Sequence, residues 1–265
     1  IEVNDCYHQH YLSLFEPTEV KMMLTAFSNM ETIHIAAYSH LLETVGMPET
    51  EYSAFLEYAE MKDKSDYLKQ FNTDTPYNTA LTMAAFGAFT EGLQLFASFA
   101  ILLNFPRFNK MKGMGQIITW SVRDESLHCE GVLWLYRQWL NEHPDIDRAA
   151  LRRDITQICK EIVEHEDRFI DLAFSMGPVQ GISAKDVKNY IRYIANLRMS
   201  QLGFGKLYPD FPRNPLPWLE EILNGVEHAN FFEQRATEYT RSGMKGRWDN
   251  VWDRIDAPVP EQPTN

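Results

Sequence analysis

Cysteine is scarce in this chain of 265 residues, which has only Cys6, Cys129 and Cys159. Their number is odd and they lie far apart, so they offer neither a disulfide framework nor a CxxC metal motif. We therefore expect a cytoplasmic protein. The opening residues also lack the basic and apolar regions of a secretory signal peptide. Because the first residue is Ile1 rather than methionine, we expect further residues to precede it.

Positive charge is also in short supply. The chain has 25 lysine and arginine residues against 37 aspartate and glutamate residues, for a formal net charge of −12. A domain that binds nucleic acid normally presents a basic face. The imbalance therefore argues against nucleic acid as a partner and, more weakly, against an anionic membrane surface.

Long hydrophobic runs are limited to one, residues 84–105, which reaches the length of a membrane span. It contains Glu91 and Gln94, and an ionisable group within such a run is usually functional or faces the protein interior. We interpret the run as a helix buried on all sides within a soluble bundle, with no membrane as a partner.

Strand signals are few, whereas helical periodicity dominates as far as about residue 205. Helix-ending glycine and proline residues separate the periodic segments, and residues 208–218 hold four prolines, which forbid a continued helix. The sequence predicts an all-α fold with one domain over residues 1–240, incomplete at its N-terminus, and a tail over residues 241–265.

Two copies of a Glu-x-x-His motif stand on long predicted helices, 94 residues apart. Glu31 and His34 form the first copy, and Glu125 and His128 form the second. Each motif places both side chains on one helix face, one turn apart. A dinuclear metal site in a four-helix bundle uses two such motifs and one carboxylate from each of two further helices. Carboxylate and imidazole ligands together suit iron or manganese.

The carboxylate of a third helix is Glu91, the only acidic residue in the apolar run and 34 residues before Glu125. An unpaired buried carboxylate is costly without a partner or a metal. The same spacing before Glu31 falls at or just before Ile1. Glu2 and Asp5 would require a shorter connection, so we expect the sixth ligand to lie just upstream of the chain.

The alternative to a metal site is that these residues are ordinary solvent-exposed side chains, because a lone Glu-x-x-His motif is usually a solvated pair. Residues 161–167 carry another acidic cluster, and we expect its members to be scattered around the exposed face of their helix. Two motifs on apolar helices with a solitary buried glutamate between them are much harder to explain in this way. The metal site is therefore the favoured hypothesis.

Two further residues lie beside the motifs. Tyr38 is one turn beyond His34, so its phenol should approach the metal pair, either as a core tyrosine or as a site of one-electron oxidation. Asp124 precedes Glu125 and could accept a hydrogen bond from a histidine ligand, or form a salt bridge with Arg123. Nearby apolar residues are expected to belong to the core and keep the site dry: Phe86, Phe89, Leu95, Phe96 and Phe99.

Five segments together resemble the small (beta) subunit of class I ribonucleotide reductase: ETIHIAAYSHLL, TEGLQLFASFA, VRDESLHCEG, IRYIANLRM and NPLPW. The resemblance extends from about residue 18 into the tail. It implies a ferritin-like helical bundle, usually a homodimer, whose dimetal centre generates an oxidised radical species. The large catalytic (alpha) subunit uses that species to reduce ribonucleotides to deoxyribonucleotides.

The resemblance also implies residue roles. Tyr38 would be the radical-site tyrosine, Asp124 would link a histidine ligand to the transfer path, and Tyr239 would relay the hole at the subunit interface. The tail would dock on the large subunit, with Trp248 and Trp252 as anchors. The implied metal ligands are Glu31, His34, Glu91, Glu125 and His128, with an aspartate or glutamate at or just before Ile1 as the sixth.

Leu95 departs from the family pattern, because many members have a phenylalanine there. It suggests a divergent subgroup and leaves open whether the metal is iron or manganese and whether Tyr38 or the metal pair holds the oxidant. Two alternatives stay open: another ferritin-like dimetal protein, such as a ferroxidase or an oxygenase component, and a plain bundle without metal. Tyr38 and the proline-rich segment with its aromatic tail favour the reductase subunit, since a storage protein needs neither.

Overall fold

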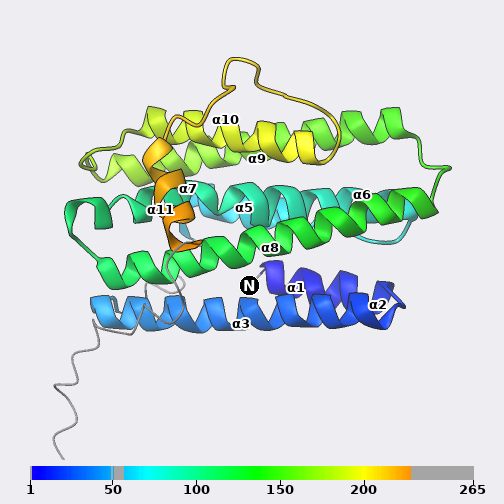
Figure 1. Ribbon diagram of the computed structural model, residues 1–265, viewed down its shortest axis with the longest axis horizontal. Coiled ribbons are helices and arrows are strands. Elements are labelled where there is room, and N and C mark those ends of the chain that lie inside the picture. The colour runs from blue at the N-terminus through cyan, green and yellow to red at the C-terminus, as the bar shows by residue number, and fades with distance from the viewer. Residues whose placement is uncertain (1, 49, 51–56, 228–265) are drawn as a thin grey trace, which may run out of the picture. The chain divides into compact units, whose positions relative to one another are not determined.

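The computed structural model describes residues 2–48, 50 and 57–227 (Figure 1). By their contacts, residues Ile1–Asn224 form one unit and Gly225–Asn265 form another. The boundary predicted at residues 240 and 241 lies outside the described residues.

The described residues form helices and no strand; Val179 and Ile182 make one isolated bridge. The predicted all-α class is therefore confirmed. The elements in chain order are α1 (Glu2–Cys6), η1 (Tyr7–Tyr11), α2 (Leu12–Leu14), α3 (Thr18–Val45), α5 (Ala59–Leu68), α6 (Pro76–Met83), η3 (Ala84–Gln94), α7 (Phe96–Leu103), η4 (Pro106–Phe108), α8 (Lys112–Glu142), α9 (Arg148–Ser175), α10 (Ala184–Gln201) and α11 (Pro217–Glu227).

Local sequence signals explain several of the helix ends. Gly46 ends α3 in the left-handed conformation (φ 82°), which glycine adopts without steric cost. Asp147 caps α9 by accepting hydrogen bonds from two backbone N–H groups. Ser183 and Asp186 form a reciprocal capping box at the start of α10.

The long helices lie side by side in Figure 1, with the α6–η3–α7 run packed among them. Helices α8, α9 and α10 all contact η3, and α3 contacts α8. Every residue of η3 is buried. The whole run Pro76–Phe108 is apolar and long enough to cross a membrane, but 78% of its most apolar window is buried inside the protein. Its burial confirms the prediction of a core helix.

The middle of this run is a π-helix rather than the regular helix that the sequence predicts. In a π-helix the backbone hydrogen bonds join residues i and i+5. Such segments are rare in proteins, and those that occur are often found at functional sites. The sequence could not reveal the π-helix. A change in helical register shows in a sequence as a shift in the spacing of polar residues, and this run is apolar on nearly every side. Glu91 lies in this segment.

The acidic cluster of α9 differs from the prediction at one residue. Glu164 is exposed and Glu161 and His165 are half-buried, but Glu166 is fully buried. Its carboxylate pairs with Lys64 from α5, and the Lys64 ammonium also lies 4.7 Å from the ring centroid of Phe169. The prediction that Glu166 lies on the exposed face is wrong. Helix α5 covers this residue, and α5 is too far away in the chain for the local sequence to reveal the contact.

Candidate metal centre

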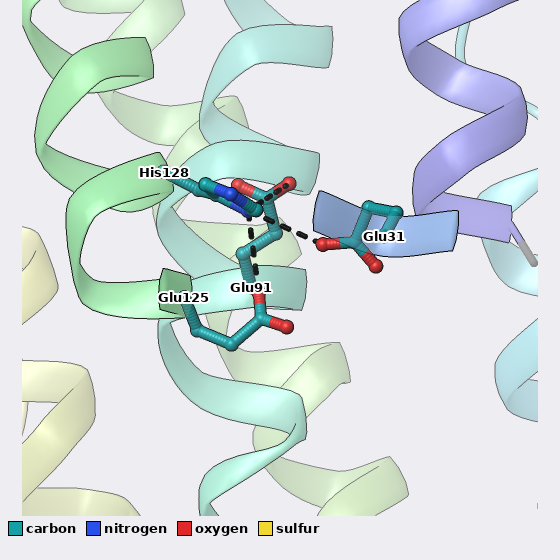
Figure 2. A group of neighbouring side chains, drawn as sticks. All are labelled: Glu31, Glu91, Glu125 and His128. Carbon is teal, nitrogen blue, oxygen red and sulfur yellow. Dashed lines mark ion pairs between the residues drawn. The ribbon is translucent and has the colours of Figure 1, made fainter. Parts of the chain in front are cut away.

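Four of the five predicted ligands converge in the core, from three different elements. Glu31 comes from α3, Glu91 from η3, and Glu125 and His128 from α8 (Figure 2). Each contributes a ligand atom, and these atoms lie within 4.8 Å of one another. All four residues are buried, with exposed fractions between 0 and 7%.

The fifth predicted ligand, His34, borders the same group. Its Nδ1 lies 3.2 Å from Glu125 Oε1 and 3.7 Å from Glu31 Oε1. The Nδ1 of His128 lies 3.2 Å from the same Glu31 oxygen, and 3.8 and 3.9 Å from oxygens of Glu125 and Glu91. Both Glu-x-x-His motifs therefore direct a histidine Nδ1 toward shared carboxylates.

The polar atoms of this group fit a metal site. Nearly all buried polar groups in proteins have a hydrogen-bond partner. Here one polar atom on each of the five residues is buried without one: Glu31 Oε1, His34 Nδ1, Glu91 Oε2, Glu125 Oε2 and His128 Nδ1. Three carboxylates and two imidazoles form the oxygen and nitrogen donor set that iron and manganese accept.

The opposite ring nitrogens of the two histidines have partners of their own. His34 Nε2 donates to Asp124 Oδ2 over 3.0 Å, and His128 Nε2 lies 3.3 Å from Met30 Sδ. A hydrogen bond at one ring nitrogen leaves the other free to bind a metal and fixes the orientation of the ring. The structure thus brings Asp124 to one of the two predicted ligand histidines, and its ion pair is with His34 rather than with Arg123.

The carboxylates and histidines of the site shift one another's pKa values. Burial lowers the pKa of His34, but the nearby carboxylates of Glu125, Glu31 and Asp124 outweigh it and raise this pKa to about 10. Burial raises the pKa of Glu31, but both histidines outweigh it and lower this pKa to about 2. Burial and then the charge of Glu125 raise the pKa of Glu91 well above its usual value. A cation between these carboxylates would relieve their repulsion and displace the histidine proton.

Tyr7 was not identified from the sequence, although it touches a predicted ligand. It lies in η1, is 1% exposed, and its hydroxyl donates to Glu91 Oε1 over 2.7 Å. Its ring also packs edge-on against His128, with centroids 6.2 Å apart. No motif marks Tyr7, since the contact joins residues 84 positions apart.

Tyr38 lies beside His34, with ring centroids 6.5 Å apart. Its hydroxyl donates to Ser121 Oγ over 2.8 Å. Burial, together with the carboxylates of the site, raises the pKa of Tyr38 to about 12, although the hydrogen bond to Ser121 opposes this. The phenol is therefore neutral and directed at a hydroxyl group on α8.

The apolar surroundings agree with the expectation of a dry core. Phe86, Phe89, Phe96 and Phe99 are buried, and Leu95 is half-buried and packs against the core. The tail residues Tyr239, Trp248 and Trp252 lie outside the described residues.

The fold and the site together define a class: a helical-bundle protein whose core could hold a dinuclear metal centre between two Glu-x-x-His motifs. The family model described as "Ribonucleotide reductase, small chain" matches residues 1–215. The chain therefore belongs to the ribonucleotide reductase small-chain family, as the resemblance predicted. Membership does not favour the alternatives of a ferroxidase or an oxygenase component.

Individual relatives agree with the assignment. A protein of Invertebrate iridescent virus 6, named "Probable ribonucleoside-diphosphate reductase small subunit 376L", is 39% identical over 96% of this chain and 81% of its own length. Two solved structures share the fold. They are the ribonucleotide reductase R2 subunit from Clostridium botulinum (TM-score 0.74, 22% identity, 84% and 73% of the two chains) and the dimanganese(II) NrdF from Streptococcus sanguinis (TM-score 0.71, 20% identity, 84% and 76%).

Proposed function

We propose that this chain is the radical-generating small subunit of a ribonucleoside-diphosphate reductase and works with a large subunit that reduces ribonucleotides. The observation that carries the proposal is the group of buried, unpartnered carboxylate and imidazole atoms in a chain that belongs to this family. A structural bundle has little use for this group, because the burial of three carboxylates and two imidazoles without a metal costs free energy that their mutual ion pairs offset only in part.

The proposed ligands are Glu31, His34, Glu91, Glu125 and His128, with a carboxylate just upstream of Ile1 as the sixth. A pair of iron or manganese ions held by these residues would supply one-electron oxidising power. The donor set accepts both metals, and the related NrdF of Streptococcus sanguinis is a dimanganese(II) protein.

The remaining residues prepare the site for that chemistry. Asp124 holds the Nε2 proton of His34, which leaves Nδ1 available as a ligand atom. Tyr7 orients one oxygen of Glu91. Tyr38 is the proposed radical site, and Ser121 accepts the hydrogen bond along which its hydroxyl proton would leave. Tyr38 packs against the buried apolar core, which limits the access of water to an oxidised phenol.

A homodimer is the proposed assembly, and exposed apolar side chains on α8 support it. Trp120, Leu127 and Trp134 recur every seven residues and are 48–52% exposed. Such stripes usually mark contact surfaces. Leu127→Glu should shift the chain to monomers in analytical ultracentrifugation, whereas the same change at Met176, an exposed residue after α9, should not. A dimer that survives Leu127→Glu would contradict this surface.

The tail, residues 241–265, is proposed to dock on the large subunit through Trp248 and Trp252. Tyr239 is proposed to relay the hole between subunits. Cytoplasmic localisation is also proposed, and the free, buried state of all three cysteines is compatible with it.

Electron paramagnetic resonance tests the proposal directly. The full-length protein is loaded separately with iron and manganese, and Tyr38→Phe is compared with the native protein. A tyrosyl signal that the variant loses supports a phenoxyl radical at Tyr38, and a metal-centred signal with retained activity moves the oxidant to the metals. Failure to retain two transition ions per chain, or to support nucleotide reduction with a cognate large subunit, would refute the proposal.

A further inference from the structure

Arg198 of α10 is a buried cation that the proposed function leaves unexplained. Its exposed fraction is 5%, and no carboxylate among the described residues forms an ion pair with it. Its Nε donates to the backbone carbonyl of Gly92 over 2.8 Å, and its Nη1 donates to Gln201 Oε1 over 2.9 Å. The guanidinium carbon lies 5.5 Å from the ring centroid of Phe96. A buried arginine is costly, so these contacts need a reason.

Gly92, the residue that receives this hydrogen bond, directly follows Glu91 in the π-helix η3. A Cβ atom at position 92 would lie 2.7 Å from Arg198 Nε and 2.9 Å from Cys129 Sγ. Both distances are well below van der Waals contact. Only glycine therefore allows the guanidinium to reach the backbone at this point.

The π-helical segment itself explains why an outside donor is useful here. Where a π-helix returns to α-helix, between η3 and α7, the hydrogen-bond register changes and carbonyl groups need other donors. A side chain that inserts into the ladder stabilises such an irregularity. Arg198 supplies a charged donor two residues before η3 ends at Gln94.

We propose that Arg198 is a positioning residue for the metal ligand Glu91. By binding the Gly92 carbonyl it holds the π-helical backbone in the register that points Glu91 at the other ligands. Tyr7 fixes the Glu91 carboxylate from the opposite end of the side chain. This inference rests on the proposed metal site, and Arg198 itself contacts none of the five ligands through a hydrogen bond or an ion pair.

The test compares Arg198→Met with Arg192→Met in the full-length protein. Arg192 is on the same helix but pairs with Asp167 on α9. Its variant therefore shows the general effect of removing an arginine from α10 without removing the contact with Gly92. Metal-free proteins are titrated with Mn²⁺ by electron paramagnetic resonance, and the ligand-field absorption of bound Co²⁺ is recorded. Arg198→Met should bind the second ion about tenfold or more weakly and change the Co²⁺ spectrum, as loss of a ligand's support does. Arg192→Met should match the native protein in both readouts.

Two further variants separate positioning from folding. Arg198→Lys keeps one donor and the charge and should restore part of the Mn²⁺ affinity. Gly92→Ala displaces the guanidinium from the other side and should reproduce the spectral change of Arg198→Met, with little further effect in the double variant. If Arg198→Met does not fold, Arg198→Lys and Gly92→Ala still decide the matter.

Native affinity and native Co²⁺ spectra in Arg198→Met and Gly92→Ala would overturn the positioning role while leaving the metal site intact. Failure of the native protein to bind two ions would instead remove the proposed function. The two failures are therefore distinguishable.

Discussion

Replacing Glu91 with glutamine should stabilise the metal-free protein and abolish most of the stabilisation by metal. The carboxylate is 1% exposed and belongs to a group of ligand atoms within 4.8 Å of one another, two of which are on other carboxylates. Its Oε1 accepts a hydrogen bond from Tyr7, but its Oε2 has no partner. A glutamine keeps the first interaction and is neutral at every pH, so it avoids the repulsion from Glu125 and Glu31 that raises the pKa of Glu91.

The expected magnitude follows from that unpaired oxygen. A buried acceptor without a partner costs about 1–3 kcal/mol, so we expect the free energy of unfolding of metal-free Glu91→Gln to rise by about 2 kcal/mol. For a unit of this size that corresponds to an increase in Tm of about 4–8 °C. Metal at a hundred times its Kd adds about 2.7 kcal/mol to the native protein, and a variant that lacks a ligand should gain far less.

The assay is thermal denaturation, followed by circular dichroism, with and without MnCl₂. Glu130→Gln is the matched control, because it removes the same charge from an exposed position on α8 and should change neither Tm nor its response to metal. A metal-free Glu91→Gln protein that melts below the native one would show that the buried carboxyl is not destabilising. A variant that keeps the full shift with Mn²⁺ would show that Glu91 is not a metal ligand.

Three other predictions concern single contacts. Asp124→Ala removes the acceptor for His34 Nε2 and should weaken Mn²⁺ binding about tenfold or more; unchanged affinity in a competition titration would contradict this. Tyr7→Phe leaves the buried Glu91 carboxylate without its donor and should lower the free energy of unfolding by about 1–3 kcal/mol in urea, and an unchanged midpoint would argue against the contact. Burial raises the pKa of Glu166 from 4.5 to about 7, so the stability that this group contributes is fully present below pH 4.5 and is lost as the pH rises through 7. The free energy of unfolding of the native protein, relative to Glu166→Gln, should therefore fall by about 3 kcal/mol between pH 4.5 and 7, and a constant difference would show that the carboxyl is not buried in solution.

The fold class and the candidate ligand residues could be recognised in the sequence because both depend on local periodicity. Side chains three or four residues apart share a helix face in any α-helix, so each Glu-x-x-His motif was recognisable without knowledge of its neighbours. Glu91 could be recognised because its charge is the exception in an apolar run. The structure places these residues together, as expected.

Contacts between distant elements could not be predicted in the same way. Glu166 and Glu164 are alike in the sequence, yet only Glu166 is covered by another helix. Tyr7 and Arg198 approach the Glu91 segment from residues 84 and 106 positions away from their partners. No spacing rule connects such pairs, because their distance depends on how whole helices pack.

Local periodicity in the sequence was enough to predict a helical bundle and five candidate metal ligands, Glu31, His34, Glu91, Glu125 and His128. The π-helical segment that carries Glu91, the contacts of Tyr7 and Arg198 with that segment, and the Ser121 partner of Tyr38 became visible in the folded chain alone. Helix periodicity is a property of neighbouring residues, whereas burial and hydrogen bonding depend on which helices meet in the core.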